Sequence, residues 1–289
     1  MSDWILEIAC KLNLVPLHYK KIPMGVVADV WHVYCKNGEE YIFKRSKFTV
    51  MKSLQIAEQL NKAKDKAILP FSLSIFVEQE YLYITYIMIR GEVQENFNIY
   101  SMKKIIDLLF HIQQNLGFYS IPSIYKDIIN NAEDVLKSNK IFDLGYLEII
   151  RNSAYRILNE ISESKLNDML QCRGHLTHGD IKPNNVVMSK EKQIYLIDWE
   201  KICSVSPEFD FVYALFYGRG IVIKDIFINE RYNYNIFCDC LKYIHDFHLI
   251  YDCYVFIKTG KRYEYIKREV LPLYTSWEKN KNKYMEMVI

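Results

Sequence analysis

Residues 178–185 of this chain read His178-Gly179-Asp180-Ile181-Lys182-Pro183-Asn184-Asn185. A second stretch follows closely and reads Ile194-Tyr195-Leu196-Ile197-Asp198-Trp199-Glu200. The pattern predicts a loop that carries Asp180 and Asn185, followed by a short hairpin that ends at Asp198. Three oxygen-bearing side chains are therefore expected around one pocket.

These side chains are of the kinds that phosphoryl transfer requires. Mg²⁺ binds a few hard oxygen ligands together with nucleotide phosphates. The attacking hydroxyl group needs a positioned carboxylate that accepts its proton. Taken alone, Asp180 is equally explained as the cap of a turn, and Asp198 as the end of a strand. Their joint occurrence in this order favours a phosphotransferase site over both structural explanations.

Through these residues the sequence resembles the choline kinase and aminoglycoside phosphotransferase family, whose members are related to protein kinases. The resemblance implies ATP and Mg²⁺ as cofactors, Asp180 as the catalytic base, and Asn185 and Asp198 as metal ligands. It also implies that Asp210 receives backbone donors from the catalytic loop and fixes its shape, although a helix cap explains Asp210 equally well on sequence alone. His178 is expected to brace the same loop by hydrogen bonding.

The N-terminal part of the chain supplies candidate nucleotide-binding residues. In a kinase-like fold, the lysine that holds the α and β phosphates ends a strand after a hairpin, and Lys44 has this place. Arg45 would point to the opposite face of the strand, so Lys44 is favoured. Glu58, on the following helix, is the best candidate partner of Lys44, although a solvent-facing role explains it nearly as well. Lys182 of the catalytic loop is also assigned to the nucleotide.

Two further segments are expected at the nucleotide. Residues 24–29 lie where a phosphate-covering loop belongs, but they contain one glycine and depart from the G-x-G-x-x-G pattern. Less close cover by backbone amides is therefore expected. The segment that precedes Arg90 and Gly91 resembles the hinge that binds adenine through its backbone, although an apolar edge strand would look the same. It consists of Thr85, Tyr86, Ile87 and Met88.

Periodicity predicts the organisation of the chain. Strands are expected over 20–22, 30–35, 40–43, 73–77 and 81–87, with a helix over 50–64. Beyond residue 90, helices are expected over 99–116, 124–137, 146–163 and near the C-terminus, with short strands at 176–177, 185–188 and 193–197. We predict an α+β, protein-kinase-like two-lobed fold. Its small antiparallel-sheet lobe, residues 1–90, binds the nucleotide, and its larger, mainly helical lobe, residues 91–289, carries catalysis and binds the acceptor.

Composition narrows the class of protein. The 289 residues suffice for a bilobal enzyme, and 50% of them are hydrophobic, as in globular proteins. The net charge of +2 is too small to indicate a nucleic acid or an anionic membrane, and the basic stretch 261–268 is better explained as a solvated helix face. Residues 1–8 carry acids where a signal peptide has basic residues, so an amphipathic helix, no membrane insertion and a cytoplasmic location are expected. Seven cysteines, an odd number, indicate reduced thiols.

Other potential ligand groups carry less weight. Cys238, Cys240, His245 and His248 are zinc-ligand types, but the two cysteines are more tightly spaced than is usual and their segment favours a helix. His111 lies on an apolar helix face and is expected to be a core residue.

The acceptor is predicted to be a small hydroxyl compound rather than a protein. About a dozen residues separate Asp198 from Asp210, where protein kinases insert a long activation segment. Lys182 keeps a protein substrate open, because this residue is less usual in small-molecule kinases, and a structural or spore-coat-type protein without turnover is a further alternative. A cationic acceptor is favoured, an amino alcohol slightly above an aminoglycoside, with a neutral sugar as the remaining option. The side chains expected to meet it are Glu200, Glu208, Trp277 and tyrosines.

Overall fold

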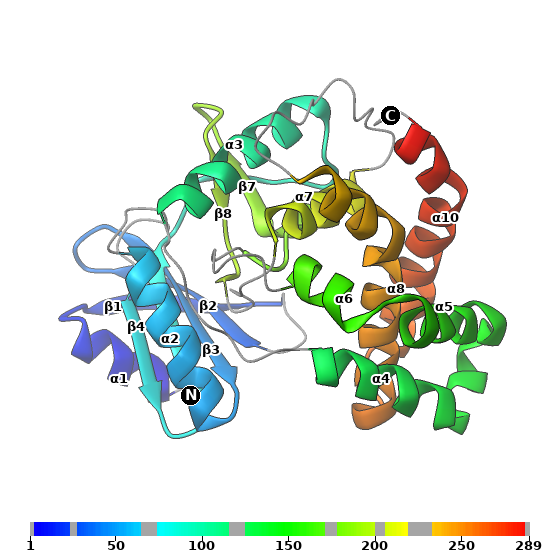
Figure 1. Cartoon of the computed structure of the whole chain (residues 1–289). Coiled ribbons are helices and arrows are strands. Elements are labelled where there is room, and N and C mark those ends of the chain that lie inside the picture. The colour runs from blue at the N-terminus through cyan, green and yellow to red at the C-terminus, as the bar shows by residue number, and fades with distance from the viewer. Residues whose placement is uncertain are drawn as a thin grey trace. The chain divides into compact units, whose positions relative to one another are not determined.

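The computed structural model describes residues 3–23, 28–64, 74–115, 125–170, 178–199, 206–218 and 233–286. The chain divides into two compact units, which are Met1–Gln94 with Asn184–Ile202, and Glu95–Pro183 with Cys203–Ile289. The first unit is built on antiparallel strands, and the second is mainly helical (Figure 1). The predicted α+β class is therefore confirmed.

An antiparallel sheet forms the centre of the first unit. From edge to edge it consists of β1 (Pro16–Ile22), β2 (Ala28–Cys35), β3 (Glu40–Lys47), β5 (Tyr81–Ile87) and β4 (Ser74–Glu78). The β2–β3 hairpin turns at Gly38, whose φ of +81° lies in the left-handed region that glycine adopts without strain. The sequence predicts this hairpin and strand β5 correctly, because turn residues and runs of aromatic and β-branched residues mark them.

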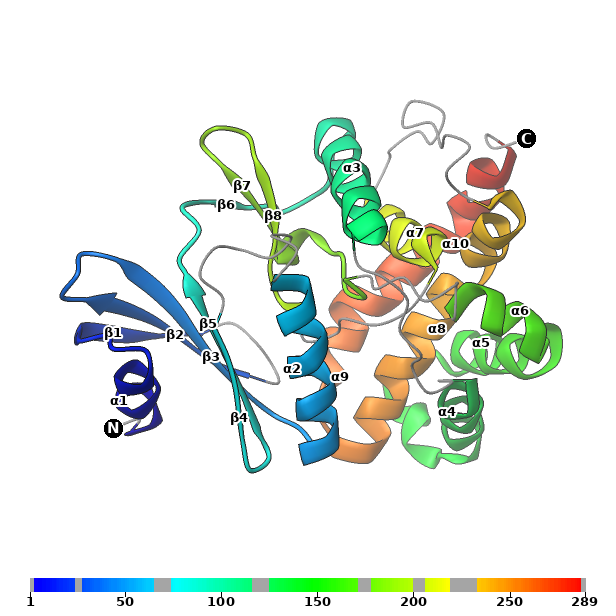
Figure 2. The ribbon, with the colours of Figure 1, turned by 60° about the vertical axis from the view of Figure 1, so that its left-hand side comes forward.

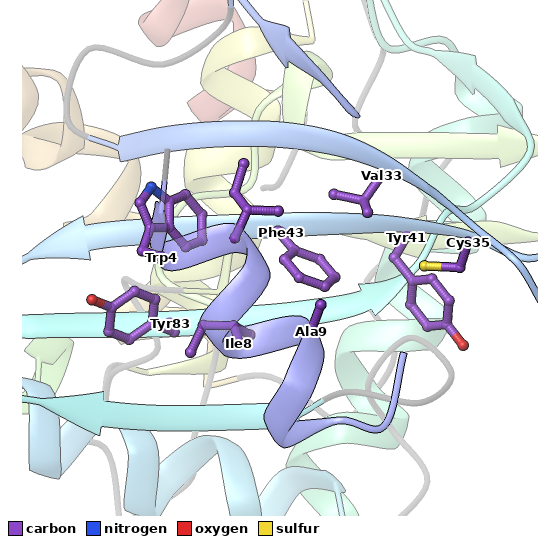
Figure 3. Packing of buried hydrophobic residues seen from close by; sticks show 9 residues of the cluster. Trp4, Ile8, Ala9, Val33, Cys35, Tyr41, Phe43 and Tyr83 are labelled. Carbon is purple, nitrogen blue, oxygen red and sulfur yellow. The ribbon is translucent and has the colours of Figure 1, made fainter. Parts of the chain in front are cut away.

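Two helices cover the two faces of this sheet (Figure 2). Helix α1 (Asp3–Lys11) lays an apolar stripe on one face, where Trp4 and Ile8 pack with Phe43 and Tyr83 (Figure 3). Helix α2 (Val50–Lys64) lies on the other face. Because successive side chains of a strand alternate between faces, Phe43 faces α1 and its neighbour Lys44 faces the side of α2.

A second, three-stranded sheet completes the first unit. Strand β7 (Val186–Ser189) pairs with β6 (Gly91–Val93) on one side and with β8 (Ile194–Leu196) on the other. A Cβ atom on Gly91 would lie 2.4 Å from the carbonyl oxygen of Met188, so only glycine allows this approach. The pairing groups residues 184–202 with the first unit, whereas the predicted lobe 91–289 contained them.

Helices make up the second unit. The longest, α8 (Tyr234–Thr259), packs against α4, α5, α7 and α10. The others are α3 (Ile99–Asn115), α4 (Tyr125–Lys137), α5 (Leu147–Glu160), α6 (Glu163–Leu170), α7 (Pro207–Tyr217), α9 (Tyr263–Tyr265) and α10 (Leu271–Glu286), with a 3₁₀ turn at Asn139–Leu144 and a π-helical turn at Ile266–Val270. Within the described residues, no helix has both the length and the apolar composition needed to cross a bilayer.

The helix expected over residues 146–163 is α5, which ends three residues earlier than expected, at Glu160. Ile161 ends α5 in an extended conformation, and its side chain is buried. The Ser162 hydroxyl then accepts a hydrogen bond from the amide of Lys165 at 3.2 Å, as an N-cap does. Helix α6, which begins at Glu163, was not predicted, because its eight residues are too few to show a clear helical period.

A partly buried polar network joins three helices of the second unit. Arg156 of α5 donates two hydrogen bonds to Asp246 of α8, at 2.9 and 2.7 Å. Glu278 of α10 accepts hydrogen bonds from His245 of α8 and, at 2.8 Å, from Lys281. Burial raises the pKa of Glu278, but the hydrogen bonds from His245 and Lys281 outweigh it and lower that pKa from 4.5 to about 2. The ionised form of Glu278 therefore stabilises the folded state.

We predict that Glu278→Gln lowers the free energy of unfolding by about 1 to 3 kcal/mol at pH 7, because hydrogen bonds to a charged group are lost. Since the folded-state pKa is below the unfolded one, the native contribution is complete above pH 4.5 and is lost as the pH falls toward 2. Chemical denaturation across this range should show the difference from the parent protein closing. Glu264→Gln, which removes an exposed partner of Arg268, is the control and should change little. A difference that stays constant down to pH 2 would contradict the assignment.

Candidate active site

The buried carboxylate of Asp210 accepts hydrogen bonds from the start of the predicted catalytic loop in the second unit. One of its oxygens accepts a hydrogen bond from the amide of His178 at 2.8 Å, and the other accepts one from the amide of Gly179 at 3.0 Å. Gly179 has φ +75°, which a side-chain-bearing residue rarely adopts. The ring nitrogen Nδ1 of His178 in turn accepts the amide of Asp180 at 3.3 Å. Asp210 and His178 thus make loop-shaping contacts of the kind the resemblance implies.

The alternative explanation of Asp210 as a helix cap does not fit the start of α7. There the cap is Ser206, whose hydroxyl accepts the amide of Phe209 at 3.0 Å, and Pro207 occupies the first turn. Asp210 lies four positions after the cap residue Ser206, and its carboxylate accepts hydrogen bonds from the loop. A negative charge in the first turn is also stabilised by the helix dipole.

Two neighbouring groups hold the carboxylate of Asp180. The phenol of Tyr213, on α7, donates a hydrogen bond to Oδ1 at 3.2 Å. The ammonium of Lys182 lies 3.1 Å from Oδ2. Asp180 is 2% exposed, so these contacts compensate much of the cost of burying its charge. Lys182, which the sequence assigned to the nucleotide, is thus brought together with the predicted base.

A lysine and an aspartate meet in the first unit, although 154 positions separate them along the chain. The ammonium of Lys44, on β3, forms an ion pair with Asp198, which follows β8. Arg45 lies on the opposite face, where its guanidinium stacks 5.0 Å from the ring centre of Trp4 and pairs with Asp29 at 2.8 Å. Of the two neighbouring basic residues, Lys44 is therefore the one on the side of the predicted metal ligands.

Asn185 and Asp198 lie at the same end of the β7–β8 ladder. Val186 pairs with Leu196, and the carbonyl of Asn185 accepts the amide of Ile197 at 2.9 Å. Asp198 comes next and has φ +71°, an uncommon value outside glycine that is found disproportionately at functional sites. Two oxygen-bearing side chains and one ammonium group are therefore available at this strand end.

The remaining predicted nucleotide residues lie on separate elements. Glu58 is exposed on α2, and its pairing with Lys44 stays a prediction. Thr85, Tyr86 and Ile87 end strand β5, and the amide of Met88 donates to the carbonyl of Glu40 at 2.7 Å. In the phosphate-covering segment, positions 24–27 lie outside the described residues, as does Glu200 among the predicted acceptor contacts.

The zinc-type residues of α8 do not assemble as a cysteine–histidine set within the described part of the chain. There, His245 groups with Asp246 and Glu278 as potential metal ligands. The guanidinium of Arg156 and the ammonium of Lys281 already neutralise these two carboxylates. A divalent cation would have to compete with both, so the group is better explained as the polar network of the fold.

The acceptor contacts proposed from sequence need revision. Glu208 is buried and accepts the amide of Asn233 at 2.5 Å, and Trp277 is buried and donates to the carbonyl of Leu241 at 3.3 Å. Both side chains therefore have hydrogen-bond partners within the second unit. The aromatic residue that touches Asp180 is Tyr213, which the sequence did not single out. Its spacing of three from Asp210 on a helix places both on one face, and that signal could have identified it.

The chain has the protein-kinase-like fold of small-molecule phosphotransferases. A choline kinase from Streptococcus pneumoniae has a TM-score of 0.70 at 16% identity, covering 98% of this chain and 99% of that one. A spectinomycin phosphotransferase, solved with ADP and spectinomycin, has a TM-score of 0.61 at 15% identity, covering 100% and 97%. An ethanolamine kinase from Plasmodium vivax has a TM-score of 0.58 at 12% identity, covering 93% and 84%. At these identities the likeness establishes the fold.

Sequence comparison adds a match of a different kind. Residues 147–229 match the model of the phosphotransferase enzyme family, and this range contains Asp180, Asn185, Asp198 and Asp210. No curated protein sequence matches the chain significantly. The predicted resemblance to the choline kinase and aminoglycoside phosphotransferase family is confirmed.

We predict that Asp210→Asn loosens the catalytic loop, because an amide cannot accept both backbone N–H groups as a carboxylate does. The amides of His178 and Gly179 should exchange with solvent faster, and the free energy of unfolding should fall by about 1 to 3 kcal/mol. Asp239→Asn, which removes a surface partner of Lys165, is the control and should leave both unchanged. Unaltered exchange at His178 and Gly179 in Asp210→Asn would show that another group shapes the loop.

Proposed function

We propose that the protein transfers the γ-phosphoryl group of ATP, with Mg²⁺, to a hydroxyl group of a small molecule. The observation that carries the proposal is the meeting of Lys44 with Asp198, next to Asn185, in a fold shared with small-molecule kinases. A partly buried pair of this kind is costly as a purely structural device, because both charges lose part of their hydration. A site that receives phosphates and a cation offers a reason for its presence.

The residues at this strand end fit a magnesium nucleotide. Asn185 and Asp198 supply the hard oxygen atoms that Mg²⁺ prefers, and Lys44 supplies a positive charge for phosphate oxygens. In the proposal, Asn185 and Asp198 hold the metal ion, and Lys44 exchanges its contact with Asp198 for the α and β phosphates. When bound, the ion would supply neutralisation of charge on the transferring phosphoryl group. Tyr86 and Met88, at the end of β5, would contact adenine through backbone groups.

Asp180 is proposed to accept the proton of the attacking hydroxyl group. Its carboxylate is buried and held at both oxygens, which is the preorganisation that a general base requires. Asp180 and Asn185 are five positions apart on the chain. The base and one metal ligand are therefore carried by one short segment, which keeps their separation below about 18 Å even if fully extended.

The acceptor is proposed to be an amino alcohol or a related cationic hydroxyl compound. Support comes from the similar structures, which include a choline kinase and an ethanolamine kinase. It also comes from the aromatic surroundings of the base: Tyr213 touches Asp180, and Tyr217 lies 5.4 Å from Tyr213 between ring centres. Aromatic faces attract organic cations. The short interval from Asp198 to Asp210 favours a small molecule over a peptide.

We predict that millimolar Mg-ATP raises the melting temperature of the protein, because a ligand at about a hundred times its Kd stabilises the native state by roughly 2.7 kcal/mol. Lys44→Met should abolish most of this increase, since it removes the phosphate contact. The matched control is Arg45→Met, which alters the neighbouring residue on the opposite face and should keep the increase relative to its own melting temperature. The proposal fails if neither Mg-ATP nor Mg-GTP stabilises the parent protein, or if both variants respond alike.

A further inference from the structure

The contact between Tyr213 and Asp180 has a defined direction. The phenol oxygen of Tyr213 lies 3.2 Å from Oδ1 of Asp180, and the two residues are 8% and 2% exposed. An ionised carboxylate has acceptors only, so the proton in this hydrogen bond comes from the phenol. With Lys182 at 3.1 Å from Oδ2, each oxygen of Asp180 has one donor. Rotation of the carboxylate about its Cβ–Cγ bond would break both contacts.

Helix α7 brings two functions to the same loop. Asp210 accepts the loop amides, while Tyr213, one turn further along the same face, contacts the side chain of Asp180. Tyr213 itself packs against other rings: it stacks on Phe209 at 6.4 Å and lies 5.8 Å from His248, both between ring centres. The phenol therefore has little freedom to move away from the carboxylate.

The protonated form of the Tyr213 phenol is favoured in the folded protein. Burial raises the pKa of Tyr213 well above 10, and the nearby Tyr217 phenol and Asp180 carboxylate raise it further. Among the described residues, the titratable or charged groups around this pair include His178 and Lys182 on the loop, Tyr217 on α7, His248 and Asp252 on α8, Arg262, and Tyr265 on α9. Tyr217 contacts His248 at 2.8 Å, and Asp252 pairs with Arg262.

We infer that Tyr213 is a positioning residue for phosphoryl transfer, which holds the carboxylate of Asp180 ionised and oriented through a hydrogen bond to Oδ1. The inference rests on the proposed function, in which Asp180 is the base. In the reaction, the acceptor O–H bond breaks and its proton passes to the Asp180 carboxylate. The acceptor oxygen forms a bond to the γ-phosphorus, and the bond from that phosphorus to the oxygen of ADP breaks. Tyr213 keeps its own proton throughout.

The test compares Tyr213→Phe in the parent protein and in the Asp180→Asn variant, with an acceptor found by screening. In the parent background, kcat should fall roughly 10- to 100-fold, which corresponds to a hydrogen bond to a charged group. KM for ATP should stay unchanged, and the acidic limb of the kcat/KM profile should move to higher pH, because the ionised base has lost a donor. Tyr155→Phe, on the exposed face of α5, is the control.

The Asp180→Asn background separates positioning from simple packing. A residue that acts through the carboxylate has nothing left to act on there, so Tyr213→Phe should change the residual rate by less than about twofold. Equal losses in both backgrounds, or a parent-like pH profile for Tyr213→Phe, would overturn the inference. If Asp180→Asn itself kept full activity, the proposed base would be wrong, which is a different failure. Thermal unfolding of each variant identifies the temperature range in which all are folded, and rates are compared there.

Discussion

A buried carboxylate that receives backbone amides is the constraint on which the candidate site depends. Asp210 is fully buried, and burying one charge costs several kcal/mol unless donors replace the lost water. The amides of His178 and Gly179 are those donors. A change in the shape of the loop would therefore leave the buried charge without hydrogen bonds. Asp180 follows Gly179 directly, so the same hydrogen bonds restrict its orientation. The contacts of Lys182 and Tyr213 add precision to a loop that is already fixed.

In the first unit, the alternation of side chains along the strands and the hydrogen-bond register of the sheets position the candidate site residues. Side chains on a strand alternate between faces, so Arg45 packs on the aromatic rings beneath α1 while Lys44 emerges on the other side. The β7–β8 ladder places Asp198 just past the pair formed by Asn185 and Ile197. The chemistry of this region thus follows from hydrogen-bond register. Of Asn185, Ile197 and Asp198, only Asp198 has a positive φ, and it lies at the end of the hairpin.

Features with a strong local signal could be predicted from the sequence. Helix 50–64 and strand 81–87 occur as expected, because periodicity and composition define them. The loop motif and the hairpin after it indicate Asp180, Asn185 and Asp198, and the family resemblance that they carry adds Asp210. Their catalytic roles stay predictions.

Features that depend on distant partners could not be predicted. Strand β6 is three residues long and exists because Gly91 allows the backbone of Met188 to approach. The bond from Arg156 to Asp246 joins positions 90 apart, and neither residue has a local pattern that reveals the other. The spacing of Tyr213 from Asp210 places it on the same helix face, but nothing local identifies Asp180, 33 positions away, as its contact. In each case tertiary packing selects the partner, and a single sequence does not contain that information in local form.

The central claim is that this chain moves a phosphoryl group to a small hydroxyl compound. The most direct measurement incubates the full-length protein with Mg-ATP and a panel of amino alcohols, aminoglycosides, sugars and homoserine-like compounds. Mass spectrometry then records ADP and any phosphorylated acceptor. We predict that one class of acceptor gains a phosphoryl group in equal amount to the ADP formed, and that chelating the Mg²⁺ abolishes both products. Binding of Mg-ATP with no phosphorylated compound from any class, or with release of inorganic phosphate alone, would contradict the account.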